Sequence, residues 1–209
     1  MNKNLIKTLI DKPDPIILDV GSFDGEDSNE FASVMPDCKI YAFEADPASL
    51  ESFKAIGHPK QVELVELAVC NIDGEIDWYS SEKRYGTEDW SLSSSLKKPH
   101  NHLNHYPVSF SEDPITVNAT KLDSWVEDNL GDQIIDFIWC DVNGAEEEFI
   151  LGGIKSLQEK TRYLYTEYFD NEMWAGQVNL DWITEKLSNF EKIEEIGHNV
   201  LLKNKKLDV

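Results

Sequence analysis

Apolar and polar positions in the first third of the chain follow two alternating patterns. Short apolar runs have the length of buried strands, at residues 16–20, 39–44 and 62–69. Apolar residues recur at helical spacing in the segments between and before them, at 2–10, 26–35 and 47–56. Alternation of strand and helix at such short intervals predicts parallel strands joined by helical crossovers.

A polar interruption separates this region from a second regular one. Two short predicted strands, 74–81 and 114–122, flank residues 82–114, which have no apolar periodicity. Long loops in compact domains are typically lids or binding segments, so we interpret 82–114 as a lid or substrate loop. Beyond it the pattern predicts helices at 122–129 and 145–151, strands at 134–140 and 162–169, and a final helix and hairpin that turns at 197–199.

Composition limits the partners that we expect. The 209 residues suit one α/β domain over 1–209, and 40 acidic against 19 basic residues give a formal charge of −21. This charge repels phosphate backbones and anionic lipids, so we expect neither nucleic acid nor a membrane as a partner. No apolar run approaches the roughly 20 residues of a membrane-spanning helix, and residues 1–15 lack a signal-peptide pattern, so we expect a cytoplasmic protein. The cysteines have no CxxC spacing and are expected to pack rather than form disulfides: Cys38, Cys70 and Cys140.

The turn after the first strand is the first candidate site. In parallel sheets, ligands bind beyond the carboxyl ends of the strands, where the strand order reverses. Gly21 and Gly25 stand in this turn without the third glycine of a dinucleotide-binding loop. Carboxylates crowd the same place: Asp19, Asp24, Glu26 and Asp27. They oppose a pyrophosphate and favour a cationic ligand such as S-adenosylmethionine, although the last three also suit the capping of a helix.

Glu44 is the second indication of a nucleoside ligand. It ends the second apolar run, where an acidic side chain can accept both hydroxyls of a ribose. The alternative for Glu44 is a solvated strand end. Together with Asp19, Gly21 and Gly25, it favours an adenosine-containing cofactor without phosphate.

Six sequence pieces occur in the order and spacing of one known family. They are LDVGSFDGEDS, YAFEADP, LAVCNIDGEI, ITVNATKLDSW, IDFIWCDVNGAEEEFILGG and YLYTEYF. From residue 16 to residue 169 the chain thus resembles the FkbM-type S-adenosylmethionine-dependent methyltransferases. The resemblance implies an α/β, Rossmann-like class I methyltransferase fold, with a mostly parallel seven-stranded sheet, an antiparallel last strand and helices on both faces. It also implies S-adenosyl-L-methionine as cofactor and methyl transfer to an oxygen of a small molecule or saccharide.

The candidate cofactor-binding residues follow from these motifs. They are Asp19, Gly21, Ser22, Gly25, Glu44, Ala45, Ala68, Val69 and Asp141. Ser94 joins them because the serine-rich stretch WSLSSSL can close over a cofactor, with Ser94 and Ser95 as hydroxyl donors.

The chain departs from the family pattern at three positions. The family usually has Lys-x-Asp-Val-Glu-Gly where this chain has WCDVNG, so Trp139 replaces a lysine and Asn143 a glutamate. Phe23 replaces an asparagine in the first turn. Three motif residues are kept: Asp141, Gly144 and Glu146. These changes do not alter the cofactor prediction. They are also compatible with an alternative function, in which the domain binds the cofactor or a partner without catalysing methyl transfer. An NAD(P)-dependent reductase is a weaker alternative, because the acidic turn opposes its pyrophosphate.

Two carboxylates at strand ends are the catalytic candidates. A hydroxyl acceptor must lose its proton, which requires a base within hydrogen-bond reach. Asp141 follows the strand at 134–140 and is the first candidate, with the capping of the next helix as its alternative role. Glu167 lies near the end of an otherwise aromatic strand, where an unpaired charge is costly, so a site role is favoured over an ion pair with Arg162 or Lys160.

The segment HNHLNH carries His100, His102 and His105 at a spacing that can recruit a metal. Matches of this kind in loops are often fortuitous. We therefore predict no metal and expect one histidine near the acceptor, with the others solvated.

Overall fold

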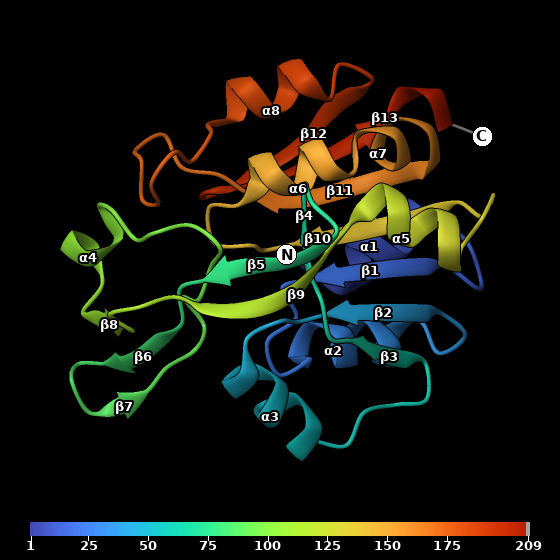
Figure 1. The fold of residues 1–209 in the computed structure, drawn as a ribbon. Helices are drawn as coiled ribbons and strands as arrows, with labels where there is room; N and C mark the ends of the chain where they lie inside the picture. The colour runs from blue at the N-terminus through green and yellow to red at the C-terminus, as the bar shows by residue number, and fades with distance from the viewer. Residues whose placement is uncertain (208–209) are drawn as a thin grey trace.

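A seven-stranded sheet between two layers of helices forms the centre of the computed structural model, which describes residues 1–207 (Figure 1). The strand order is β12-β13-β11-β10-β1-β2-β3, and β13 runs antiparallel to both of its neighbours while the other pairs are parallel. The strands are β1 (Ile16–Val20), β2 (Lys39–Phe43), β3 (Val62–Val65), β10 (Ile135–Cys140), β11 (Thr161–Glu167), β12 (Phe190–Ile196) and β13 (Asn199–Asn204). The predicted class I methyltransferase fold is confirmed.

Apolar side chains on both faces of the sheet explain why its central strands are continuous hydrophobic runs. All five residues of β1 are buried. Ile17 packs with Ile6 and Phe31 of two helices on one face, α1 (Lys3–Ile10) and α2 (Glu26–Val34). Leu18 packs in a larger core on the other face. The helices of that core are α5 (Leu122–Asn129), α6 (Glu146–Gly152), α7 (Ile154–Lys160) and α8 (Leu180–Lys186).

The strand order reverses between β1 and β10, and the turns after these two strands are in close contact. Asp141 N–H donates to Val20 O at 2.9 Å. Gly21 has a left-handed backbone (φ 85°), and a Cβ placed on it would lie 1.8 Å from Asp141 O. The first glycine of the turn is therefore required by this backbone contact, which places Asp141 beside the first turn.

The predicted strand over 62–69 is wrong as one element. It divides into β3 and β4 (Ala68–Cys70), and β4 leaves the main sheet to pair with β9 (Ile115–Lys121), which also pairs with β5 (Gly74–Trp78). An apolar run does not specify which sheet its strand joins, and Leu67, between the two strands, lines a cavity. The helix α3 (Pro47–Ala55) has the predicted start, with Asp46 as its N-cap.

Residues 82–114 contain regular structure, so the prediction of a loop without elements is also wrong. They contribute to a three-stranded sheet of β6 (Ser81–Arg84), β7 (Glu88–Asp89) and β8 (Val108–Phe110), and they include α4 (His102–His105). These strands are short and mostly polar, so no apolar period marks them. Figure 1 shows this region, in green, beyond the carboxyl ends of the parallel strands.

The closing hairpin and the cysteines agree with their predictions. The closing hairpin turns at Gly197 and His198, as predicted, whereas α7 was not anticipated. Cys38, Cys70 and Cys140 are buried free thiols, in agreement with packing. Within residues 1–207, no helix combines the length and apolarity that crossing a membrane requires.

Candidate active site

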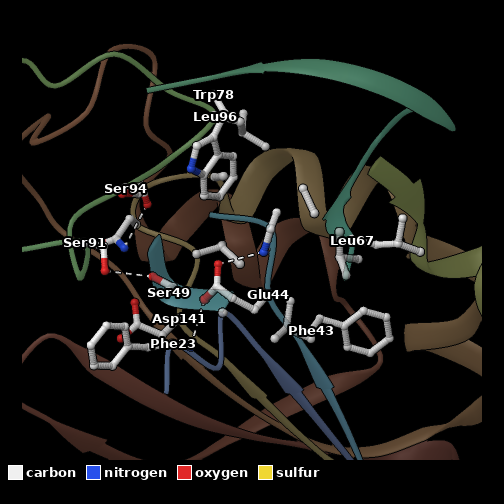
Figure 2. A pocket seen from close by; sticks show the side chains of 18 of the residues that line it. Phe23, Phe43, Glu44, Ser49, Leu67, Trp78, Ser91, Ser94, Leu96 and Asp141 are labelled. Atoms are coloured by element: carbon white, nitrogen blue, oxygen red, sulfur yellow. Dashed lines mark hydrogen bonds between the residues drawn. The ribbon is translucent and has the colours of Figure 1, made fainter. Parts of the chain in front are cut away.

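A cavity lies at the point where the strand order reverses. It contains about 640 Å³ of space free of protein atoms, counting solvent at its mouth. Seven of the predicted cofactor-binding residues line it: Gly21, Glu44, Ala45, Ala68, Val69, Ser94 and Asp141. Its apolar wall was not predicted as part of the site, and Figure 2 shows several of its members around Glu44: Phe43, Leu67, Trp78 and Leu96.

Glu44 is fixed at the floor of this cavity by backbone donors. Its Oε2 accepts from Phe23 N–H at 2.8 Å, and Oε1 accepts from Ala45 N–H at 2.7 Å and Asp46 N–H at 2.8 Å. Burial raises the pKa of Glu44 to about 7, and these three donors oppose the rise. A carboxylate has about four lone-pair sites, so Glu44 keeps acceptor capacity for a ligand in the cavity.

Asp19, Ser22 and Gly25 do not line the cavity. Asp19 lies beneath the turn, where its Oδ2 accepts from Ser28 Oγ at 2.5 Å and its buried Oδ1 has no partner within residues 1–207. Desolvation raises the pKa of Asp19 to about 7, with an additional contribution from the charge of Asp27. Gly25 is the left-handed N-cap of α2 and packs on Phe53 and His58. Ser22 is buried, and its backbone N–H donates to Phe43 O.

Asp141 is exposed to the cavity beside Gly21. The surrounding protein limits its hydration, and this desolvation, together with the charge of Asp27, raises the pKa of Asp141. The alternative role in helix capping is wrong, because α6 begins later, with Ala145 as its N-cap and no side-chain capping bond.

Two further carboxyl groups, those of Glu167 and Glu146, are close enough to Asp141 for its charge to raise the pKa of each. Glu167 has no ion pair with Arg162 or Lys160: Arg162 binds Asp136, and Lys160 donates to a backbone carbonyl. Burial, followed by the charges of Asp141 and Glu146, raises the pKa of Glu167 to about 9. Glu146 is fully buried, and desolvation raises its pKa to about 7. The sequence did not predict this complete burial of Glu146, which belongs to a kept family motif.

The serine-rich stretch lies over the cavity and is tied down at two places. Ser91 Oγ accepts from Ser49 Oγ at 2.9 Å, as Figure 2 shows. Asn143 Nδ2 donates to Leu92 O at 3.0 Å and Ser94 O at 3.2 Å, and Asn143 O accepts from Ser95 Oγ at 2.8 Å. Asn143, where the family usually has glutamate, thus holds the segment over the cavity. The sequence carried no signal for this contact.

Trp139, which stands where the family has lysine, receives a cation from a distant part of the chain. The Nζ of Lys3, on α1, lies 3.4 Å from the centre of the Trp139 ring and forms an ion pair with Asp27. Lys3 is buried, 6% exposed. A positive charge therefore remains on this face of the sheet, close to the carboxylates of Asp19 and Asp27.

The three histidines of HNHLNH do not converge. His102 is buried, whereas His100 and His105 are exposed. Within residues 1–207, no group of three or more His, Cys, Asp or Glu side chains has the geometry to hold a metal ion.

The chain is similar to known methyltransferases in sequence and in fold. The model of the family described as the methyltransferase FkbM domain matches residues 19–198. A 2-O-methyltransferase, NoeI of Sinorhizobium fredii, is 38% identical over 207 residues, which is 97% of this chain and 84% of that protein. The crystal structure of a candidate rRNA methylase from Clostridium thermocellum superposes with a TM-score of 0.51 at 8% identity, covering 96% of this chain and 93% of that one. The latter likeness concerns the fold alone.

Proposed function

This chain belongs to the FkbM methyltransferase domain family, and from that premise we propose that it methylates a hydroxyl oxygen of a small molecule or saccharide with S-adenosylmethionine. The observation that carries the cofactor assignment is the charge of the cavity. Two carboxylates, Glu44 and Asp141, line it without any lysine or arginine among its lining residues. Such a site attracts a sulfonium and repels a diphosphate.

The residues around the cavity fit an adenosine-containing ligand. Phe43, Leu67 and Trp78 provide an apolar wall for a base, and Glu44 has free acceptor capacity for ribose hydroxyls. When bound, S-adenosylmethionine supplies an electrophilic methyl carbon, and its sulfur keeps the electron pair of the broken C–S bond. The segment held by Asn143 shields this space from water, which favours displacement by the acceptor over side reactions.

Asp141 and Glu167 have different roles in this proposal. Like charges close together in a poorly hydrated site do not both ionise readily. Asp141 is exposed to the cavity, whereas Glu167 is less accessible and has a pKa of about 9. Asp141, the more accessible of the two, is therefore the group that we assign to take the proton of the acceptor hydroxyl. Glu167 is protonated in the empty site and can donate a hydrogen bond to the acceptor.

The relative in Sinorhizobium fredii is described as a 2-O-methyltransferase, which supports an oxygen as the methyl acceptor. The formal charge of −21 favours an acceptor other than nucleic acid. A silent cofactor-binding domain is the second candidate, supported by the two departures at Trp139 and Asn143.

Two measurements test the proposal. Calorimetry should show binding of S-adenosylmethionine and of S-adenosylhomocysteine but not of NADH, and binding of NADH alone would overturn the cofactor assignment. Transfer of radiolabelled methyl groups to a panel of phenols, polyols and glycosides then tests catalysis. Cofactor binding without transfer to any member would favour the silent domain.

A further inference from the structure

A second cavity of about 560 Å³ adjoins the first, and Asn143 lines both. The walls of the second cavity come from the region of 82–114, from the end of β11 and from the loop before α8. Its principal side chains are Trp90, His102, Tyr106, Asn143, Glu167 and Trp174. A small molecule in this space would therefore lie next to the cofactor cavity, with Asn143 in contact with both spaces.

Aromatic rings dominate the second cavity. The ring centres of His102 and Trp174 are 4.7 Å apart, and those of His102 and Tyr106 are 4.9 Å apart. Trp174 is fixed, since it is 1% exposed and packs against Gly144, where a Cβ would lie 2.3 Å from its ring. Trp174 therefore supports His102 from behind, and the more exposed rings of Trp90 and Tyr106 offer flat apolar surface to a ligand that has an apolar face.

Polar groups with unused hydrogen-bonding capacity stand among these rings. Within residues 1–207 the buried Nδ1 of His102 has no partner, and the carboxyl group of Glu167 lines the same cavity. The buried imidazole is neutral, because desolvation lowers its pKa to about 4. A sugar ring has the matching chemistry: a C–H face that packs on aromatic rings and hydroxyls that both donate and accept hydrogen bonds.

Few charged side chains line the second cavity. Its one basic side chain, Arg84, lies over the Trp90 ring at 4.3 Å, and Glu167 is its one acidic side chain. Because Glu167 is protonated near neutral pH in the empty site and His102 is neutral, one positive charge remains among the lining residues, that of Arg84 on the Trp90 ring. The acidic surface of the whole chain opposes a nucleotide-linked sugar.

We propose that the second cavity is the acceptor site and that it binds a neutral pyranoside, an inference that rests on the methyl transfer proposed above. The C–H face of the ring packs on Trp90 and Tyr106, and the ring hydroxyls pair with Glu167 and His102. One hydroxyl extends past Asn143 into the cofactor cavity. There its O–H bond breaks, its proton goes to Asp141, and its oxygen bonds to the methyl carbon as the C–S bond breaks.

Saturation-transfer NMR on the protein loaded with S-adenosylhomocysteine tests this assignment. The probes are the methyl pyranosides of glucose, galactose, mannose and N-acetylglucosamine, with catechol as a planar aromatic and UDP-glucose as a charged sugar. We expect at least one neutral pyranoside to bind, and Trp90→Ala and Tyr106→Ala to weaken it about tenfold. Tyr85→Asn is the matched control, because Tyr85 is 67% exposed on the same hairpin and does not line the cavity.

The outcomes separate this inference from the proposed function. If S-adenosylhomocysteine does not bind the wild type, the proposed function fails. If it binds and no pyranoside does, or if only catechol or UDP-glucose does, the pyranoside assignment is overturned. If a pyranoside binds equally to the wild type and to both cavity variants, the location is overturned. Retained binding of S-adenosylhomocysteine by each variant shows that its fold and cofactor cavity are intact.

Discussion

We expect S-adenosylmethionine to release about one proton more than S-adenosylhomocysteine when each binds near pH 7. The two ligands differ by one methyl group and one positive charge, so the comparison isolates the effect of the sulfonium. Burial holds the pKa of Glu44 at about 7 and, together with neighbouring carboxylates, that of Glu167 at about 9. In the empty site Glu44 is thus half protonated and Glu167 fully protonated near pH 7.

The magnitude follows from Coulomb's law. A unit charge at roughly 6 Å, with an effective dielectric constant of about 20, contributes about 3 kcal/mol, or about two pKa units. Such a shift would take Glu44 to about 5 and Glu167 to about 7, and each group would then release about half a proton near pH 7. The two ligands should differ in proton release from about pH 5, the pKa of Glu44 with the sulfonium bound, to about pH 9, the pKa of Glu167 in the empty site. Above that range the difference disappears, because both groups are already ionised in the empty site.

Calorimetric titration in buffers of different ionisation enthalpy measures the number of protons released. Glu167→Gln and Glu44→Gln should each remove about half of the difference between the two ligands. Equal proton release by the two ligands in the wild type would refute the reasoning, since it would mean that the sulfonium lies far from the raised carboxyl groups or that they are already ionised.

Four further outcomes follow from the site. Glu44→Ala is expected to weaken cofactor binding by about 1–3 kcal/mol, measured by calorimetry, because a charged hydrogen-bond acceptor is lost. Asp141→Asn is expected to lower kcat by about 10²–10⁴ while cofactor affinity changes little, measured with radiolabelled methyl donor. Asn143→Gly keeps the left-handed backbone (φ 50°) but removes two hydrogen bonds, so it should speed dissociation of S-adenosylhomocysteine about tenfold and increase hydrogen exchange at 91–95. Burial raises the pKa of Glu146 to about 7, so its contribution to the free energy of unfolding is complete below pH 4.5 and is lost as the pH rises to about 7. Glu146→Gln should therefore flatten the decline in the free energy of unfolding between pH 4.5 and about pH 7, measured with urea.

Matched controls and contrary results make these predictions specific. Glu51→Ala on the exposed side of α3 and Asp170→Asn on the surface should leave binding and kcat unchanged. Wild-type cofactor affinity in Glu44→Ala, or wild-type kcat in Asp141→Asn, would remove those residues from the site. Unchanged exchange at 91–95 in Asn143→Gly would show that the segment is held by other contacts. Parallel pH profiles of unfolding for Glu146→Gln and the wild type would show that Glu146 titrates normally.

Much of the architecture could be predicted because its signals are local. Strands buried on both faces appear as continuous apolar runs, and β1 has the bounds that its run predicts. The division of 62–69 between two sheets could not be predicted, because it depends on pairing with β9, about 50 residues later in the sequence. The polar strands β6 and β7 are defined by backbone pairing and leave no hydrophobic period.

The part of the candidate site that lies at strand ends could be predicted, because residues that directly follow parallel strands meet at one edge of the sheet. Glu44 and Asp141 follow their strands directly, and the sheet brings both to one cavity. Asp19 lies beneath that cavity, because alternate residues of a strand point to opposite faces of the sheet. The contacts of Asn143 with 92–95 and of Lys3 with Trp139 join distant segments, and one sequence alone carries no local pattern for either.

A crystal structure of the protein grown with S-adenosylhomocysteine would test the central claim most directly, that the cavity at the ends of β1, β2 and β10 binds an adenosine derivative free of phosphate. The account predicts the ribose hydroxyls on Glu44, the base against Phe43 and Leu67, and the sulfur on the side of Asp141. A ligand bound elsewhere, or a diphosphate occupying this cavity in crystals grown with NADH, would contradict it.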